Sequence, residues 1–517
     1  MKSNRMMLSA ALAAVACLAA LSDAQARRPL PSQVRQSGPV LPLYVAPPSS
    51  GTGTWKLLKH NPTNNMIPET ALLLTDGTVL VHSECTADWY RLKPDRHGSY
   101  IRGTWTQAAS MQSGYTPLYF ASQVLADGRV IVNGGEYINC SQAFTTEGAI
   151  YDPVADTWTP VAPPEGWTTI GDAQSAILAD GTYMLADCCS VKEALAAISG
   201  DTVTWTATGS GKFDVNDEEG WTVLPDQTLL TVDTNRRASN FDFTEIYAPA
   251  AGTWTAGQDT ASALADPATA EIGPAPLLPN GYVLQLGGTG QNNVFNMRNG
   301  AWTAAPSFPD IGGQLDSADG PAAVLPSGNV LAQVSPGAFA RPSHFFEISV
   351  KTAHNVQITQ VSEPLNSQNV SSFQGRMLVL PTGQVMLSLD VGEIAIYTPK
   401  GKPKAAWLPT VTVVAPSILR GSQNNVVQGT LFNGLTQGGY YGDDAQMATN
   451  YPLVRFTNIA TGDVCYARTH DHSSMGISTG GPTSTQFDVP SSCEAGASNL
   501  EVVANGIASA PVSVTLN

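Results

Sequence analysis

Acidic side chains recur at one place in the sequence pattern and are the first candidates for chemistry. They precede short apolar runs that are typical of β-strands. They are Glu69, Asp172, Glu218, Glu219, Glu271, Asp316 and Asp319. Carboxylates crowded in a concave, partly dry site raise one another's pKa or recruit a cation. Each carboxylate could instead cap loop amides or face solvent, but their shared position favours one acidic site built from several loops.

Two histidines, His470 and His472, are the second candidate because they stand two residues apart. On a strand this spacing points both rings to one face, as a metal or a polar ligand requires. Polar loops also contain such pairs. The segment 438–444, Gly-Gly-Tyr-Tyr-Gly-Asp-Asp, has the composition of a loop, whether or not it binds a ligand. The sequence offers no pattern typical of a Ser-based triad or of a phosphate-binding glycine loop.

The chain that must position these residues is repetitive. A Trp recurs every 47 to 53 residues, at Trp55, Trp105, Trp158, Trp205, Trp254 and Trp302. Between them lie seven units of apolar strand, tight turn and apolar strand, starting at Ala71, Ala121, Ser175, Gly220, Ala275, Ala322 and Met377. Asp-Gly, Asn-Gly and Ser-Gly at the turns are typical of hairpins, whose backbone needs positive φ. This period predicts an all-β chain with a seven-bladed β-propeller over residues 51–400, its last blade closed by the N-terminal strand, residues 52–58.

Beyond the repeats the pattern changes. Longer alternating strands from about Pro409 predict an immunoglobulin-like β-sandwich over residues 409–517, joined to the propeller by a linker at residues 401–408. We therefore expect two domains of different architecture in one all-β chain.

The N-terminus indicates export. Lys2 and Arg5, an apolar run and the Ala-Gln-Ala sequence that ends at Ala26 predict a signal peptide over residues 1–26. Lipidation at Cys17 is the alternative. Residues 27–50 form a Pro-rich segment, and no later stretch has the roughly 20 apolar residues of a membrane span. We expect a secreted protein, extracellular or periplasmic.

Charge and cysteine content agree with this interpretation. Only 13% of residues are charged and the formal net charge is −16, which argues against nucleic acid and anionic membranes as partners. Acidity that merely keeps a secreted protein soluble explains most of this charge. Outside the leader there are six cysteines, an even number suited to disulfides. We predict the pairs Cys85–Cys140 and Cys465–Cys493. The adjacent Cys188 and Cys189 could form a strained vicinal bond, stay reduced or bind something.

Short motifs link the predicted propeller to a known family. Gly134-Gly135, Gly287-Gly288 and the segment from Tyr151 to Trp158 are kelch-like signatures. With the C-terminal sandwich, they resemble the galactose oxidase and glyoxal oxidase group of secreted copper-radical enzymes. That resemblance implies a copper ion held by two Tyr and two His, with one Tyr cross-linked to a Cys and covered by an aromatic ring.

The ligand positions implied by the resemblance are only partly kept. Phe373 and Gln374 stand where the family has its Tyr-His pair, and no Cys occurs near Pro68, where the cross-link partner would fall. Tyr119 matches the cross-linked Tyr and Tyr137 the covering ring. His470 matches the family's second His, on a finger of the sandwich. We therefore predict no copper-radical cofactor, and a finger of residues 470–472 that reaches the acidic site.

These residues favour an extracellular binding protein. Aromatic residues accompany the carboxylates at the proposed mouth, which favours a glycan or glycoconjugate as ligand. They are Tyr115, Tyr119, Phe120 and Tyr137. The predicted ligand-binding residues are Glu69, Tyr119, Tyr137, Asp172, Glu218, Asp319 and Gln374, with His470 and His472 as metal ligands for a divalent cation. The rival hypothesis is an enzyme on the same scaffold, either an oxidase with an altered site or a carboxylate-using hydrolase or lyase.

Overall fold

The computed structural model describes residues 51–60, 66–235, 242–444 and 447–517. The predicted signal peptide and the Pro-rich segment, residues 1–50, lie outside the described residues. Apart from three short 3-10 helices, η2 (Ser367–Asn369), η3 (Ser372–Gln374) and η4 (Ala405–Trp407), the described elements are β-strands. The chain is therefore all-β, as its turn-rich composition predicts.

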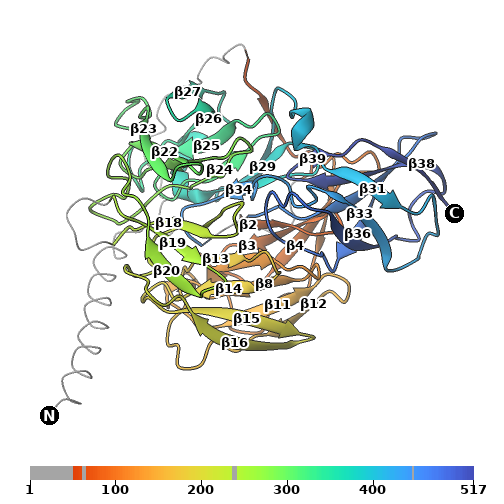
Figure 1. The fold of residues 1–517 in the computed structure, drawn as a ribbon, viewed down its shortest axis with the longest axis horizontal. Coiled ribbons are helices and arrows are strands. Elements are labelled where there is room, and N and C mark those ends of the chain that lie inside the picture. Colours follow the sequence, from red (N-terminus) through yellow and green to blue (C-terminus); the bar gives the residue numbers. More distant parts are fainter. Residues whose placement is uncertain (1–50, 61–65, 236–241, 445–446) are drawn as a thin grey trace.

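Seven antiparallel sheets follow one another through described residues 54–398, and a further small sheet forms within residues 117–142 (Figure 1). Sheets 1 to 4 each have four strands. They are β2 (Pro68–Leu73), β3 (Val79–Ser83), β4 (Trp89–Lys93) and β5 (Thr104–Gln107); β7 (Ala121–Val124), β8 (Val130–Asn133), β11 (Gly148–Asp152) and β12 (Thr157–Pro160); β13 (Ser175–Ile177), β14 (Tyr183–Ala186), β15 (Glu193–Ser199) and β16 (Thr202–Thr208); and β17 (Thr222–Val223), β18 (Leu229–Val232), β19 (Thr244–Ala248) and β20 (Thr253–Ala256).

Sheets 5 to 7 vary this plan. Sheet 5 has three strands, because the first half of its predicted hairpin forms only a bridge between Leu277 and Val283. Sheet 6 gains a fifth strand, β34, from the C-terminal region. The strands are β21 (Tyr282–Leu286), β22 (Asn292–Asn296) and β23 (Ala301–Ala305); β24 (Ala322–Val324), β25 (Val330–Val334), β26 (His344–Thr352), β27 (Asn355–Gln360) and β34 (Gly439–Tyr440); and β28 (Gly375–Val379), β29 (Val385–Leu389), β30 (Glu393–Thr398) and β1 (Thr54–Leu57). A small sheet joins β6 (Pro117–Leu118), β9 (Tyr137–Ile138) and β10 (Ser141–Gln142).

The two ends of the repeat region meet. Strand β1 pairs antiparallel with β30, from Thr54 opposite Thr398 to Leu57 opposite Ala395, as predicted for the N-terminal strand. The first strands of successive sheets also lie side by side: β2 beside β7, β7 beside β13, β24 beside β28, and β28 beside β2. Sheet 7 thus packs against sheet 1, so the faces that a linear array would expose at its two ends cover each other.

The recurring Trp residues link neighbouring sheets. The indole N–H of Trp158 donates to the carbonyl of Ala109 at 2.9 Å, and that of Trp205 donates to Ala162 at 2.8 Å. Trp55, on the strand that closes sheet 7, donates to Ser362 at 2.7 Å. Each accepting carbonyl lies in the segment that leads from the preceding sheet. The same bond therefore explains the recurrence of Trp at these positions, whereas Trp254 donates instead to the Glu193 carboxylate at 2.7 Å.

The hairpin turns show why glycine recurs in the repeat. Gly77, between β2 and β3, has φ +76°. The equivalent turn between β17 and β18 places Gln227 at φ +74°, and its side-chain amide donates to the carbonyl of Pro225 at 2.7 Å. A left-handed backbone is thus required at both positions, and glycine meets this requirement at the lowest cost.

The C-terminal strands pair with one another in a separate sheet and enclose a second hydrophobic core. Its members are β31 (Thr410–Val414), β32 (Ser417–Ile418), β33 (Asn425–Thr430), β35 (Leu453–Asn458), β36 (Val464–His470), β37 (Thr483–Asp488), β38 (Gly496–Ala504), β39 (Ile507–Ala508) and β40 (Val512–Leu516). Val427, Phe456, Phe487 and Leu500 are buried in this core. Figure 1 shows these strands in blue beside the repeats, with β34 among the sheets.

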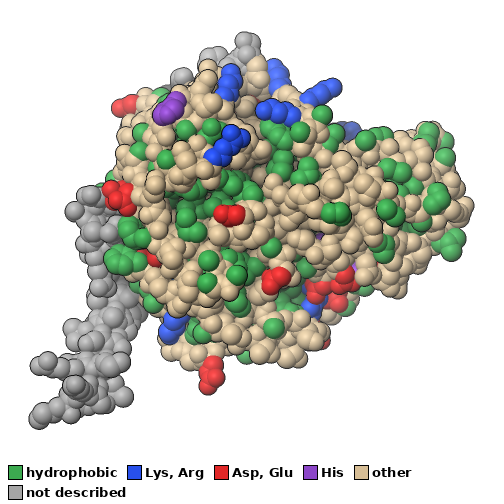
Figure 2. All heavy atoms as spheres, in the orientation of Figure 1, with side chains coloured by type: hydrophobic (Ala, Val, Ile, Leu, Met, Phe, Trp, Pro, Cys, Tyr) green, Lys and Arg blue, Asp and Glu red, His purple; other side chains and the backbone are tan. Residues whose placement is uncertain are grey.

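Charge is sparse on the face seen in Figure 2, where Asp and Glu side chains are scattered among polar and apolar ones. Many carboxylates lie inside instead: Glu69, Asp172, Glu271 and Asp319 are each no more than 2% exposed. Within the described ranges we find no helix long and apolar enough to cross a membrane.

Candidate functional site

Five buried carboxylates from both parts of the chain converge. The ligand atoms of Asp172, Glu218 and Asp443 all lie within 4.8 Å of one another, and so do those of Glu218, Glu271 and Asp319. Glu218 belongs to both groups. We call these five residues the carboxylate cluster; each is 1% to 4% exposed. Four of them are residues that the sequence pattern singles out, and the structure does bring these four together.

The repeat explains how four of these side chains meet. Each stands nine or ten residues before the turn residue of its own hairpin, in sheets 3, 4, 5 and 6. The backbone is left-handed here: φ is +59° at Glu218 and +48° at Asp319, while Gly171, with φ +67°, directly precedes Asp172. The Asp319 N–H donates to the carbonyl of Ile272 at 3.0 Å, so this loop is fixed to the loop of sheet 5.

The fifth carboxylate arrives from the C-terminal region. The segment of residues 434–444 and 447–451, which we call the insertion segment, carries β34, which pairs with β24. A Cβ atom added to Gly442 would lie 2.6 Å from Asp319 Oδ1, so only glycine lets the backbone pass so near this carboxylate. Asp443 follows directly and joins the cluster.

A buried arginine lies beside the cluster. Arg376, 2% exposed, is 2.9 Å from Glu69, and its guanidinium lies 3.9 Å from the ring centroid of Tyr441 in the insertion segment. Burial raises the pKa of Glu69, but Arg376 and His82 lower it more, to about 2. Burial and the neighbouring Asp443 raise the pKa of Asp444 well above its usual range. Arg376 and His82 therefore compensate the negative charge of Glu69, whereas the carboxyl groups of Asp443 and Asp444 lie close enough to repel each other when ionised.

Aromatic side chains form a wall next to Arg376. Tyr119, Tyr137, Phe373 and Leu118 are one buried cluster, with Tyr119 at φ +52° and its ring 6.0 Å from that of Tyr137. Burial raises the pKa of Tyr119 well above its usual range. Three of the positions matched to the copper-radical family, Tyr119, Tyr137 and Phe373, thus lie together.

These residues do not fit a copper ion. Phe373 has no ligand atom, and the Gln374 side-chain oxygen accepts the Ser371 N–H at 3.0 Å while its amide nitrogen lies 3.5 Å from Asp390. Cys85, which packs against this cluster, is in a disulfide. Copper favours imidazole and thiolate, whereas carboxylates favour hard cations such as Ca²⁺, Mg²⁺ and Mn²⁺.

The histidine pair lies elsewhere, which corrects the predicted finger. The ring nitrogens of His470 lie 2.8 Å from Asp471 and 3.1 Å from Asp488. His472 Nδ1 bonds to Thr485 at 2.8 Å, and burial lowers the pKa of this histidine to about 3. Neither ring belongs to a group of potential metal ligands among the described residues. Asp471 has φ +49°, so the strand ends and the i, i+2 rule no longer applies.

Four other predicted residues are also placed outside the cluster. Glu219 forms an ion pair with buried Lys212 at 2.7 Å. Asp316 accepts a hydrogen bond from the Ala318 N–H at 3.2 Å, and burial raises its pKa to about 7. Tyr115 and Phe120 are fully buried in the core of the repeats.

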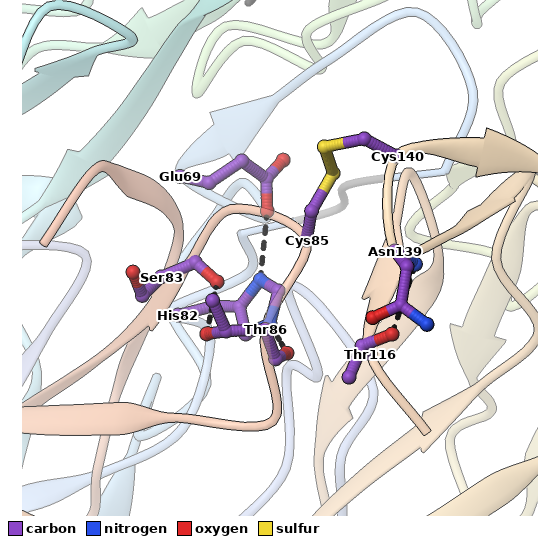
Figure 3. The surroundings of a disulfide bond; sticks show 8 residues. All are labelled: Glu69, His82, Ser83, Cys85, Thr86, Thr116, Asn139 and Cys140. Atoms are coloured by element: carbon purple, nitrogen blue, oxygen red, sulfur yellow. Dashed lines mark hydrogen bonds and ion pairs between the residues drawn. A yellow bond between two sulfur atoms is a disulfide. The ribbon is translucent and has the colours of Figure 1, made fainter. Parts of the chain in front are cut away.

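Sequence reasoning missed Arg376 and His82. His82 Nδ1 lies 3.5 Å from Glu69, and its Nε2 lies 2.8 Å from the carbonyl of Thr86 (Figure 3). Both stand inside apolar strands, β28 and β3, where a charged or titratable residue is a visible exception. That exception is the signal that could have found them.

Both predicted disulfides are present. Cys85 is bonded to Cys140, joining sheets 1 and 2, and Cys465 to Cys493 within the C-terminal strands. Figure 3 shows the first bond close to the Glu69 and His82 side chains. No bond joins Cys188 to Cys189 in this structure, although their Sγ atoms lie 2.6 Å apart.

Comparisons with known proteins give limited similarity. No protein-family model and no curated protein matches this chain. A fungal alcohol oxidase of the AA5 family in complex with copper is 14% identical with a TM-score of 0.42, over 87% of this chain and 85% of that one. A streptogramin B lyase is 10% identical with a TM-score of 0.47, over 68% and 98%. A catalytically inactive virginiamycin B lyase from Staphylococcus aureus with quinupristin is 10% identical with a TM-score of 0.46, over 67% and 99%. At this similarity none of the three assigns an activity to this chain.

Proposed function

We propose that the chain is a secreted seven-bladed β-propeller protein with a C-terminal immunoglobulin-like β-sandwich, and that it binds an extracellular glycan or glycoconjugate through a divalent cation held by the carboxylate cluster. The observation that carries this proposal is the convergence of five buried carboxylates from four sheets and the insertion segment. Buried carboxylates at such distances repel one another unless they take up protons or a cation. Their oxygen ligands suit Ca²⁺ or Mg²⁺.

A cation at this place has a use in ligand binding. Calcium takes six to eight oxygen ligands, so ligand hydroxyls can complete a shell that the protein leaves unfilled. Tyr119, whose ring centroid lies 5.5 Å from the Arg376 guanidinium, and the adjacent Tyr137 supply aromatic rings, which suit the apolar face of a sugar ring. The Cys85–Cys140 bond supports export to an oxidising compartment.

Calorimetric titration of the chelator-treated protein with Ca²⁺, Mg²⁺ and Mn²⁺ tests the cation. We expect one ion per chain and, for Asp319→Asn, an affinity at least about tenfold weaker, or about 1.4 kcal/mol. The control is Asp259→Asn, which neutralises an exposed aspartate. Equal affinities in the two variants, or no binding to the parent, would overturn the cation proposal.

A glycan array probed with and without chelator tests the ligand. We expect hydroxyl-rich ligands to bind only with the cation present. If the cation binds but a substrate is turned over in its presence, the rival hypothesis of a carboxylate-using hydrolase or lyase replaces the binding protein. Hydrogen peroxide formation that requires added copper would instead restore the oxidase.

A further inference from the structure

Two adjacent cysteines pack against the loop that carries Asp172 of the carboxylate cluster. Cys188 and Cys189 follow strand β14; Cys188 is fully buried, whereas Cys189 is partly exposed. Their Sγ atoms are 2.6 Å apart. Non-bonded heavy atoms rest at about 3.5–4.0 Å, and a disulfide bond is about 2.05 Å. At 2.6 Å two unbonded sulfur atoms would overlap, so the geometry favours a covalent bond between them.

The pair supports the loop that carries Asp172. The Cys188 N–H donates to the carbonyl of Ile170 at 3.1 Å. A Cβ atom on Gly171 would lie 2.5 Å from Cys188 Sγ, so the sulfur packs directly on the backbone of this loop. The next residue is Asp172, one of the five carboxylates. A shift of the sulfur would therefore move the loop and, with it, this carboxylate.

We propose that Cys188 and Cys189 form a vicinal disulfide in the mature protein and that this bond positions Asp172 in the carboxylate cluster. The first half stands on the geometry of the pair alone, while the second half rests on the proposed function. The bond would hold the two sulfur atoms, and the Ile170 carbonyl bonded to this turn, in one fixed arrangement.

The bond forms by thiol–disulfide exchange. The partly exposed Cys189, as its thiolate, attacks a donor disulfide of the oxidising compartment and releases one donor thiol. Cys188 then loses its proton and displaces the second donor sulfur from Cys189. The two cysteines are oxidised, the donor disulfide is reduced to two thiols, and both protons end on these thiols.

A soft metal ion is the competing occupant, because Asp187, Cys188 and Cys189 each offer a ligand atom within 4.8 Å. Metal binding requires both cysteines as thiolates. Burial and the nearby Asp172 raise the pKa of Cys188 well above its usual range. Cys188 is fully buried, where a charged thiolate without a partner is costly, so the site favours the uncharged disulfide.

The test is peptide mapping of the natively folded, secreted protein under non-reducing, thiol-blocking conditions. Cleavage before Asp187 and Asp201 releases residues 187–200, whose only cysteines are this pair. We expect the unblocked peptide, lighter than its reduced form by the mass of two hydrogen atoms. A peptide blocked at both sulfurs would overturn the disulfide. Blocking that appears only after chelation would show a metal site instead.

The positioning role has its own readout. Cys188→Ser with Cys189→Ser should weaken cation binding about tenfold while the Cys85–Cys140 bond stays intact. The matched control is Ser199→Ala in the same sheet, which should bind like the parent. Unchanged cation affinity in the double variant would refute the positioning role. A parent that binds no cation refutes the proposed function but leaves the disulfide, which mass alone decides.

Discussion

Replacing the buried Lys212 by Met should destabilise the fold in a strongly pH-dependent way. Its ammonium group lies 2.7 Å from Glu219 and 2.6 Å from Glu245, and all three side chains are at most 1% exposed. Asp233 is 3.8 Å away. Burial lowers the pKa of Lys212, but the three carboxylates raise it more, so the lysine stays charged. Met keeps the length and the apolar stem while removing the charge.

The magnitude follows from what the carboxylates must then do. Breaking a buried pair by removing one partner costs about 3–5 kcal/mol. A carboxyl can avoid this cost by taking up a proton, at about 1.4 kcal/mol for each pH unit above its unfolded pKa of about 4.3. At pH 7.5 that is about 4 kcal/mol for one carboxyl, and at pH 5 about 1 kcal/mol. The free energy of unfolding of the variant should therefore be lower than that of the parent by about 3–5 kcal/mol near neutrality and by only about 1–2 kcal/mol at pH 5.

Urea unfolding followed by tryptophan fluorescence at pH 7.5 and pH 5 measures both values. Lys351→Met, at an exposed position of strand β26, controls for the change of residue type. Equal losses at the two pH values would refute the reasoning, because they would show that no charge is left unpaired. So would a loss no larger than that of the control.

Three further outcomes are expected. Arg376→Lys should cost about 2 kcal/mol of unfolding free energy, because an ammonium cannot replace the planar guanidinium stacked 3.9 Å from Tyr441; a loss below about 0.5 kcal/mol in urea would contradict this. Burial lowers the pKa of His472 in the folded state to about 3. Its neutral ring therefore contributes to the free energy of unfolding above about pH 6.5, and this contribution is lost as pH falls toward 3. Between pH 6.5 and pH 4, His472→Gln should therefore lose about 3 kcal/mol less unfolding free energy than the parent, as measured by calorimetry. Equal losses in the two proteins would refute this prediction. Cys465→Ala with Cys493→Ala, which opens a link across 28 residues, should cost about 2–4 kcal/mol, and an unchanged urea midpoint would count against it.

Local, repeated features of the fold could be predicted from the sequence. Each hairpin needs a left-handed turn residue, so its position can be read from Asp-Gly, Asn-Gly and Ser-Gly pairs and, in sheet 4, from Asp226-Gln227 in the same place. Counting back from that residue gives Asp172, Glu218 and Asp319, which the structure brings together. The count works because the distance from turn to loop is set by strand length and repeats from sheet to sheet.

Side-chain direction within a loop could not be predicted in the same way. Glu218 and Glu219 are adjacent and both acidic, yet only Glu218 enters the cluster. With Glu218 at φ +59°, the next side chain points toward Lys212, which lies in the connection from sheet 3. No local pattern marks that lysine as the partner, because the contact depends on how two neighbouring sheets pack.

The choice of segment that enters from the C-terminal region also depends on tertiary contacts. The insertion segment carries Tyr441, whose hydroxyl donates to the Phe373 carbonyl at 2.7 Å, and Tyr451, whose hydroxyl donates to the carbonyl of Leu73. Gln437 accepts the Val223 N–H at 2.9 Å. These bonds reach sheets 1, 4 and 7, whereas the ring nitrogens of His470 and His472 bond to Asp471, Asp488 and Thr485 of the C-terminal region. Composition alone favoured His470 and His472, since imidazoles suggest metals more strongly than a glycine-tyrosine loop does.

The same contacts make the two parts of the chain depend on each other. Asp443 is a member of the carboxylate cluster, and Tyr441 covers the guanidinium that neutralises Glu69. Without the insertion segment, Arg376 would lose its stacked ring, and β24 would lose one of its two partner strands. The cluster is thus complete only when the C-terminal strands are folded against the repeats. Any ion or ligand that binds the cluster must therefore stabilise both parts together, since the binding free energy is available only to the fully assembled chain.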